Sequence, residues 1–299
     1  MIRFFTAVLF VTSLSGLASA QTPDAAQRVA PPKVARYGHD AAAGNAFTHD
    51  GIKLYYEVYG AGEPVLLVHG NGGSIADLSA QLAHFRKRYK VIAMDSRDQG
   101  RSADSPDAIT YEKMTDDLAA LLDHLKVGPV NVLGWSDGGI EALLLGIRHP
   151  AKVKKIASMA ANLNPTDQAV SADVLAIVKT LLETMPADSP ENRRERKVTG
   201  IMLTEPHIDA KSLEAITAPT LVMAGDHDLI RLEHIVDIYN HLSNSQLVIF
   251  PNATHMIPFD DPATFNGAVD RFFRAPFAKK DRIKDTFKSL ERLRASQKH

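Results

Sequence analysis

A serine lies at the centre of a glycine-flanked segment, G-W-S-D-G, at residues 134–138. The segment directly follows an apolar run at residues 130–133 and precedes a helical pattern at residues 140–148. In a sharp turn between a strand and a helix, flanking glycines leave room for the backbone, and the serine projects as a nucleophile. The alternative is an ordinary turn in which the serine only caps the helix. The position directly after a predicted strand favours Ser136 as a nucleophile.

A serine hydroxyl needs a base, and the base needs an acid to orient it. His255 follows an apolar run at residues 247–250, and Asp228 follows another at residues 221–224. If these runs are parallel strands, both residues lie at the sheet edge where the strands end, as does Ser136. The sequence therefore predicts a Ser-His-Asp triad of Ser136, His255 and Asp228.

Acyl transfer also requires donors for the charge that develops on the substrate oxygen. The glycine-rich segment H-G-N-G-G-S at residues 69–74 follows an apolar run at residues 64–68. We assign the backbone N–H groups of Asn71 and Asp137 to this oxyanion hole, and we expect His69 to hold the loop rather than react. The segment lacks the Lys-Ser/Thr of a phosphate-binding loop.

The elements that position these residues follow from hydrophobic patterns. Helical patterns, such as the apolar face at residues 114–125, alternate with short apolar runs. This alternation predicts a doubly wound, mostly parallel sheet with helices on both faces. The predicted strands are residues 52–59, 64–68, 91–94, 130–133, 156–159, 221–224 and 247–250, and the first of them alternates as an edge strand would.

A long segment at about residues 164–213 separates two of the predicted strands. A crossover needs only one helix, so the excess predicts a small helical cap over the sheet. Within the cap, we expect the basic cluster at residues 193–197 to be a solvated helix face rather than an anion site.

Composition excludes several classes of protein. The chain has 299 residues, is 45% hydrophobic and 23% charged, and carries a net charge of −1, which indicates a globular protein whose partners do not include nucleic acid. The absence of cysteine excludes disulfides, thiolate nucleophiles and cysteine zinc sites. His227, His234 and His241 lie near Asp226 and Asp228, but their spacing does not place three ligands on one helix face, so we expect no metal.

The two ends of the chain have patterns of their own. Residues 1–20 combine Arg3, an apolar run and the cleavage pattern A-S-A, which predicts a signal peptide cleaved after Ala20 and a periplasmic or secreted protein. Residues 21–45 are predicted to be a flexible lead-in. Residues 277–299 are predicted to form a basic amphipathic helix, which either docks on its own domain or lies on a membrane surface. No segment predicts stable membrane insertion.

Residues 46–276 resemble the α/β-hydrolase superfamily, on these motifs and the segment D-S-R-D-Q-G-R-S at residues 95–102. Within it, G-W-S-D-G-G at residues 134–139 is most similar to the serine esterases of the valacyclovir-hydrolase (biphenyl hydrolase-like) group. The resemblance implies an α/β-hydrolase fold: a mostly parallel eight-stranded sheet, helices on both faces, a cap after the sixth strand, and no cofactor.

The resemblance also assigns roles to single residues. Ser136 matches the nucleophile and His255 the general base. Asp228, rather than Asp226, matches the acid because it is the fourth residue of the G-x-x-D turn. Asp98 replaces the glycine usual in the D-x-R-G-x-G loop, which we expect to be structural.

Asp137 and Trp135, which flank Ser136, are the residues that we expect to contact substrate. Asp137 leaves two interpretations open. The resembled group has a similar residue here and prefers α-amino acid esters, so the carboxylate can attract an amino group; alternatively, it only occupies the first helical turn, where the helix dipole favours an acid.

The sequence thus predicts a serine hydrolase for small to medium carboxylic esters that works through an acyl-enzyme. A lactonase, a C–C bond hydrolase or a cofactor-free haloperoxidase could use the same triad. A ligand-binding protein with an inert triad is the remaining alternative.

Overall fold

The computed structural model describes residues 36–296. The expected signal peptide and most of the expected lead-in lie outside the described residues. Within the described range, eight strands form one sheet in the order β1-β2-β4-β3-β5-β6-β7-β8. The strands are β1 (Gly44–His49), β2 (Ile52–Tyr59), β3 (Pro64–Val68), β4 (Lys90–Met94), β5 (Val130–Trp135), β6 (Val153–Met159), β7 (Thr220–His227) and β8 (Ser245–Thr254).

The sheet is mostly parallel. β1 pairs with β2, and β2 with β4, in antiparallel register, and the other neighbouring pairs from β4 to β8 are parallel. The central parallel strands β3, β4 and β5 are buried along almost their whole length, as expected of strands that helices cover on both faces. The fold class expected from the sequence is confirmed.

The prediction that residues 52–59 form an edge strand is wrong. β2 lies between β1 and β4, and Leu54, Tyr55 and Tyr56 are all buried. The edge position belongs to β1, whose sequence G-N-A-F-T-H lacks the apolar run by which the other strands were predicted. β1 also begins within the expected lead-in.

Helices cover the two faces of the sheet. α2 (Ser79–Phe85) connects β3 to β4, whereas α3 (Tyr111–His124), α4 (Asp137–Arg148) and α7 (Leu232–His241) connect strands in the opposite direction along the sheet. Right-handed crossovers therefore place α2 on one face and these three helices on the other. After β8, the short α8 (Ile257–Asp260) and α9 (Pro262–Arg274) pack beside α2.

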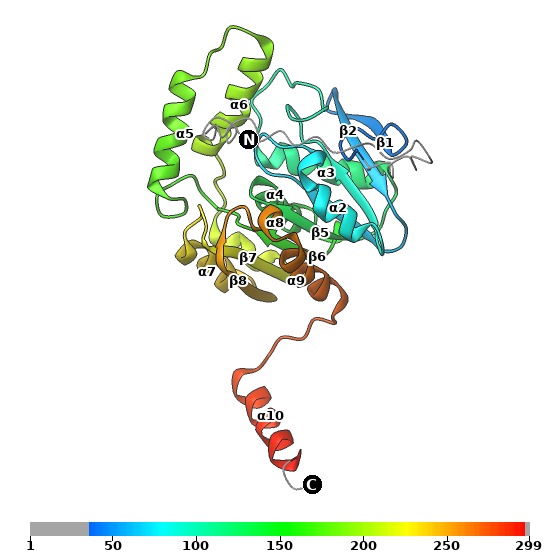
Figure 1. The fold of residues 1–299 in the computed structure, drawn as a ribbon, viewed down its shortest axis with the longest axis vertical. Helices are drawn as coiled ribbons and strands as arrows, with labels where there is room; N and C mark the ends of the chain where they lie inside the picture. Colours follow the sequence, from blue (N-terminus) through cyan, green and yellow to red (C-terminus); the bar gives the residue numbers. More distant parts are fainter. Residues whose placement is uncertain (1–35, 297–299) are drawn as a thin grey trace, which may run out of the picture.

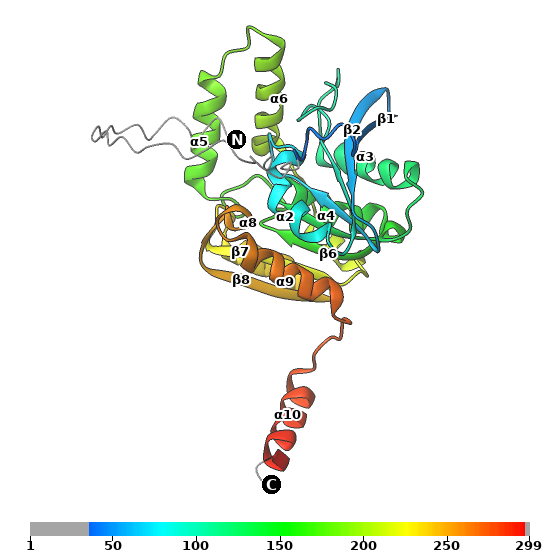
Figure 2. The same ribbon diagram turned by 45° about the vertical axis from the view of Figure 1, so that its right-hand side comes forward.

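The segment after β6 contains two long helices, α5 (Ala172–Thr184) and α6 (Pro190–Thr204). They pack against each other and stand together at one end of the molecule (Figures 1 and 2). Arg196 of α6 donates to the carbonyl oxygens of Leu182 and Met185 at the end of α5, which joins the two helices.

The last helix, α10 (Arg282–Ser296), projects away from the domain at the end opposite α5 and α6 (Figures 1 and 2). Docking of this helix on its own domain, one of the two expected arrangements, is contradicted: its apolar side chains are 42–65% exposed. The sheet face nearest to it is already covered by α9, which buries Phe265 and Val269. No helix in the described range is long and apolar enough to cross a bilayer.

Candidate active site

The turn between β5 and α4 holds Ser136 in a strained conformation. Its φ is 57° and its ψ −120°, in a region that non-glycine residues rarely adopt. A Cβ on Gly134 would lie 1.8 Å from the carbonyl oxygen of Gly138, and one on Gly138 would lie 2.3 Å from that of Val68. Both glycines of the motif are therefore required sterically. The N–H of Ser136 donates to the carbonyl of Met159 at 2.9 Å, which helps to hold the turn.

The structure brings His255 and Asp228 together. His255 Nδ1 lies 2.7 Å from Asp228 Oδ1, and both side chains are almost completely buried. The backbone N–H groups of Gly225 and Ile230 donate to the Asp228 carboxylate at 3.2 and 3.1 Å. This arrangement fixes the imidazole with Nδ1 toward the acid and leaves Nε2 as the nitrogen that can take a proton.

Asp226 has a different function from Asp228. Its carboxylate accepts from the backbone N–H groups of Asn252 and Ala253, at 2.9 Å each. These bonds connect the ends of β7 and β8, and they hold the pKa of Asp226 below its usual range. Asp226 thus supports the strand ends that present Asp228 and His255.

A pocket lies where the strand ends meet α5 and α6. Ser136, Asp137 and His255 lie in its wall. Most of the remaining lining is apolar, and the cap contributes a large part of it. The other lining residues are Tyr111, Asn162, Val170, Val174, Leu175, Val178, Met202, Glu205, Leu229 and Ile230.

The two residues assigned to the oxyanion hole are linked by their side chains. Asn71 Nδ2 donates to Asp137 Oδ2 at 2.9 Å and to the carbonyl oxygen of Val198 in α6 at 2.9 Å. Asp137 is the first residue of α4, so its N–H has no acceptor within the helix and can serve a ligand. One asparagine therefore joins the loop after β3, the nucleophile turn and the cap.

The loop that carries Asn71 is held by His69. Its Nδ1 lies 2.8 Å from the carbonyl oxygen of Gly70, and its Nε2 accepts the N–H of Ser96 at 3.1 Å. Both ring nitrogens are thus used in holding the loop. Behind it, Asp95 accepts from the N–H groups of Ile75 and Arg101, both at 2.7 Å.

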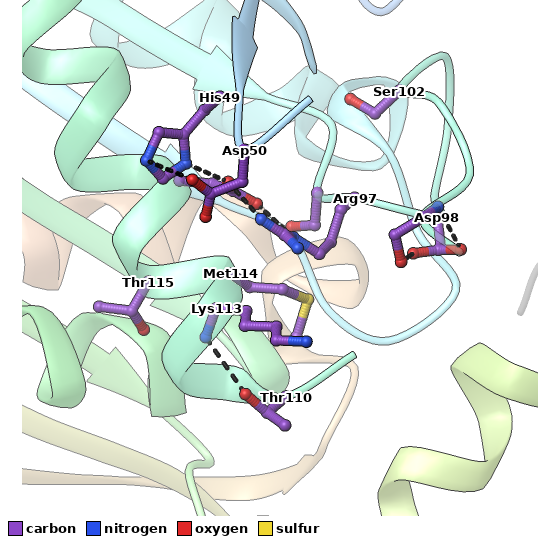
Figure 3. A network of polar contacts seen from close by, with 12 residues as sticks. His49, Asp50, Arg97, Asp98, Ser102, Thr110, Lys113, Met114 and Thr115 are labelled. Carbon is purple, nitrogen blue, oxygen red and sulfur yellow. Dashed lines mark hydrogen bonds and ion pairs between the residues drawn. The ribbon is translucent and has the colours of Figure 1, made fainter. Parts of the chain in front are cut away.

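A buried ion pair anchors the loop after β4 to α3. Arg97 binds Asp117 through two bonds of 2.6 and 2.7 Å, and His49 Nδ1 lies 2.8 Å from the same carboxylate. Figure 3 shows His49 and Arg97 converging beside α3, with Asp98 directed away from them. The hydrogen bonds that Arg97 donates to Asp117 raise the pKa of the Arg97 guanidinium.

Asp98, which replaces a glycine of the resembled loop, connects the domain to the cap. Its φ of 61° is in the glycine-favoured region. Its buried carboxylate accepts from Ser105 and from Lys197 Nζ, the latter at 2.8 Å, while Arg194 donates to the Asp98 carbonyl oxygen at 2.6 Å. The expectation that residues 193–197 form only a solvated face is therefore wrong: Arg194 and Lys197 bind the loop after β4.

Two carboxyl groups, those of Asp137 and Glu205, and the phenol of Tyr111 line the pocket. Burial raises the pKa of Asp137, although hydrogen bonds from Asn71 and Tyr111 act in the opposite direction. Burial also raises the pKa of Glu205, which lines the same pocket. One helical turn after Asp137, burial and the Asp137 charge raise the pKa of Glu141 well above its usual value.

Trp135 lies behind the pocket. Its indole N–H donates to the carbonyl oxygen of His255 at 2.9 Å, and its ring packs against His255 and Phe259. Trp135 is not among the lining residues. We therefore correct its expected role from contacting substrate to positioning His255.

The histidines near Asp228 do not form a metal centre. His234 Nε2 accepts the N–H of Leu163 at 2.9 Å, and burial lowers its pKa. Within residues 36–296, no three His, Asp or Glu side chains are grouped so as to hold a metal ion.

Several pocket residues were not found from the sequence. Tyr111 begins α3 and Glu205 follows α6, so each lies at a helix end far from the motifs in the chain. The basic cluster of α6 was a visible signal for the contact between cap and domain. Which residues accept hydrogen bonds from these basic side chains depends on how the cap folds back onto the domain. The local sequence pattern does not record this.

This fold, with a serine on a strained strand-to-helix turn and a buried His-Asp pair in the same pocket, defines the class of α/β hydrolases. A family model described as "alpha/beta hydrolase fold" matches residues 63–202. Serine hydrolase BPHL from Homo sapiens is 30% identical over 267 residues, covering 81% of this chain and 91% of that protein. The chain therefore belongs to the α/β hydrolase family.

One further relative and one solved structure are similar to this chain. The putative carbamate hydrolase RutD of Caulobacter sp. (strain K31) is 30% identical over 258 residues, covering 73% of this chain and 95% of that protein. The fold is also similar to the crystal structure of MGS-M2, an alpha/beta hydrolase enzyme from a Medee basin deep-sea metagenome library. The TM-score is 0.67 at 22% identity, covering 79% of this chain and 100% of that one.

Proposed function

We propose that this protein is a serine hydrolase that cleaves small to medium carboxylic esters. One observation carries the proposal: Ser136, on its strained turn, shares a pocket with His255, whose Nδ1 is held by the buried Asp228. The similarity to serine hydrolase BPHL supports a serine nucleophile. The mainly apolar lining supports a substrate of modest size and low polarity.

The proposed reaction proceeds in two halves. His255 Nε2 takes the proton of the Ser136 hydroxyl as its oxygen attacks the carbonyl carbon, and the N–H groups of Asn71 and Asp137 stabilise the oxyanion. The C–O bond to the alcohol then breaks, the alcohol leaves with the proton from His255, and an acyl-serine remains. Water, deprotonated by His255, releases the acid and restores Ser136.

Asp228 acts on His255 rather than on the substrate. Its carboxylate holds the Nδ1–H tautomer and stabilises the imidazolium that forms in both halves of the reaction. Trp135 supports the same ring from behind by donating to the His255 carbonyl oxygen.

The acidic residues of the pocket lining favour substrates that are neutral or carry an amino group over anionic ones. Asp137 and Glu205 both line the pocket, and the described lining contains no Lys or Arg. The Asp137 carboxylate already accepts from Asn71 and is buried, so Glu205 is the more accessible partner for an ammonium group. Because burial raises the pKa of Glu205, this preference will strengthen as the pH rises through that pKa.

A carbamate is the second candidate substrate. The same acyl-serine chemistry applies to it, and a relative of 30% identity is named a putative carbamate hydrolase. We also propose that residues 1–20 direct export to the periplasm or beyond; their basic, apolar and A-S-A pattern supports this. A mature N-terminus at Gln21 is the expected result of mass spectrometry on the secreted protein.

The test of the proposed activity is hydrolysis of p-nitrophenyl acetate, butyrate and octanoate, beside p-nitrophenyl carbamates and lactones. Wild type and Ser136→Ala are compared. We expect ester turnover that the variant lowers by several orders of magnitude without loss of folding. Lactones or carbamates cleaved with esters left intact would reassign the substrate. Equal turnover by the variant would overturn the nucleophile.

A further inference from the structure

The unpartnered face of α10 is the most prominent feature that the proposed reaction does not use. Ile283, Phe287, Leu290 and Leu293 are 65%, 61%, 42% and 55% exposed. Their spacing of four, three and three residues aligns them along one side of the helix. Exposed large apolar side chains gathered on one face indicate a surface that another body covers.

The charge around this face is positive. Residues 279–299 contain eight Lys or Arg and three Asp or Glu. Lys284 lies three residues before Phe287, and Arg294 lies four residues after Leu290, so each neighbours the apolar face on the helix surface. The acidic Asp285 and Glu291 leave the helix with a net positive charge.

We propose that α10 is an interfacial anchor that lays its apolar face into the surface of a bilayer of anionic phospholipid. An amphipathic helix with a basic polar face and low overall hydrophobicity has the properties of such anchors. Anionic headgroups complement the cations that border the apolar face. A second copy of the chain is the poorer occupant, because it would bring an equal positive charge, including another Arg294, against the same face.

The position of the helix permits this contact without blocking the pocket. α10 lies at the end of the molecule opposite α5 and α6, and those two helices border the pocket (Figures 1 and 2). An anchored molecule would keep its pocket directed away from the bilayer. We therefore expect anchoring to hold the hydrolase at a membrane while leaving its pocket open to substrates dissolved in water.

The test is cosedimentation with vesicles of phosphatidylcholine containing phosphatidylglycerol, against vesicles of phosphatidylcholine alone. A chain starting at Gln21 retains every described residue and lacks the apolar N-terminal segment, which could itself bind lipid. We expect binding to the anionic vesicles only. Binding should weaken as the salt concentration rises above about 0.1 M, where the screening length is about 10 Å.

Two double variants separate the apolar from the electrostatic contribution. Phe287→Ser with Leu290→Ser should weaken binding more than tenfold, because less apolar surface enters the bilayer. Lys284→Gln with Arg294→Gln should weaken binding about 30-fold, at about 1 kcal/mol for each cation near the surface.

A matched control removes two positive charges elsewhere. Lys179 and Lys211 are exposed side chains of α5 and of the segment after α6, so Lys179→Gln with Lys211→Gln lowers the net charge equally without changing α10. This variant should bind like wild type. Equal binding to both vesicle types, or binding unchanged by the α10 variants, would overturn the proposal. So would a dimer in sedimentation equilibrium that Phe287→Ser with Leu290→Ser dissociates and that does not bind vesicles.

Discussion

Asn71 offers the sharpest test of how the site is assembled. Its Nδ2 group donates to the buried Asp137 carboxylate and to the Val198 carbonyl oxygen, both at 2.9 Å. Asn71→Ala leaves both acceptors without this donor. A hydrogen bond to a charged group contributes about 1.5–3 kcal/mol and a neutral one about 0.5–1.5 kcal/mol. The expected loss of stability is therefore about 3 kcal/mol, or a fall in Tm of about 5 °C for a chain of this size.

The same substitution should slow the reaction. The backbone N–H proposed for the oxyanion hole remains, but the side chain that fixes its loop to the nucleophile turn is lost. Removing an oxyanion donor altogether lowers kcat by about 10²–10³. Loosening one should lower kcat by a smaller factor, about 10–100, with little change in KM.

The assays are thermal unfolding and steady-state ester hydrolysis, with Asn244→Ala as the control. Asn244 Nδ2 makes one bond, to the Thr217 carbonyl oxygen, at the opposite ends of the strands. Its loss should cost about 1 kcal/mol and leave kcat unchanged. An Asn71→Ala variant with the Tm and kcat of wild type would refute the view that this asparagine joins the loop, the turn and the cap.

Three further substitutions test the acid, the cap and a buried carboxyl. Asp228→Asn should lower kcat about 10⁴-fold by favouring the wrong imidazole tautomer, whereas Asp226→Asn should keep kcat within about fivefold; equal losses would contradict the assignment of the acid. Lys197→Met should speed amide hydrogen exchange in α6 by removing a bond to the loop after β4, and Arg193→Met, which loses only a bond within the cap, should not. If α6 exchanges equally in both, the cap is not held by that bond. The free energy of unfolding of Glu141→Gln, measured in urea, should exceed that of wild type by an amount that grows as the pH rises above about 4.5, by up to about 1.4 kcal/mol per pH unit. A difference independent of pH would show that Glu141 has an ordinary pKa.

The sign of the Glu141 effect follows from its environment. Burial raises its pKa well above 4.5, and its Oε2 atom has no hydrogen-bond partner. Between the unfolded and folded pKa values, the folded protein keeps a proton that the unfolded chain releases. The stability that this proton contributes is complete below the unfolded pKa and is lost as the pH rises through the folded one.

Much of the fold was predictable because its signals are local. Apolar runs gave six of the parallel strands directly, and the helical period located α3, whose Met114 and Leu118 are buried. β1 was missed because an edge strand needs little apolar character. Without β1, the segment that forms β2 was placed at the edge of the sheet. α10 was predicted as a helix, but where it lies depends on whether the domain offers it an uncovered face, which no local pattern records.

The residues of the site also divide into those with a local sequence signal and those without one. Ser136, Asp228 and His255 could be named because each directly follows a strand, and parallel strands end at one edge. Trp135 was misassigned because sequence neighbours on such a turn point to opposite sides. The contacts of Glu205 and Lys197 could not be predicted from the sequence, because they depend on the path of the cap.

The central claim is that Ser136 is an activated nucleophile, and reaction with a fluorophosphonate probe tests it most directly. Peptide mass spectrometry of the labelled protein should find the adduct on Ser136 and none in Ser136→Ala. The buried Ser158, one strand away, serves as an internal control and should stay unlabelled. A folded wild-type protein that does not react, or one whose adduct lies on another serine, would contradict the account.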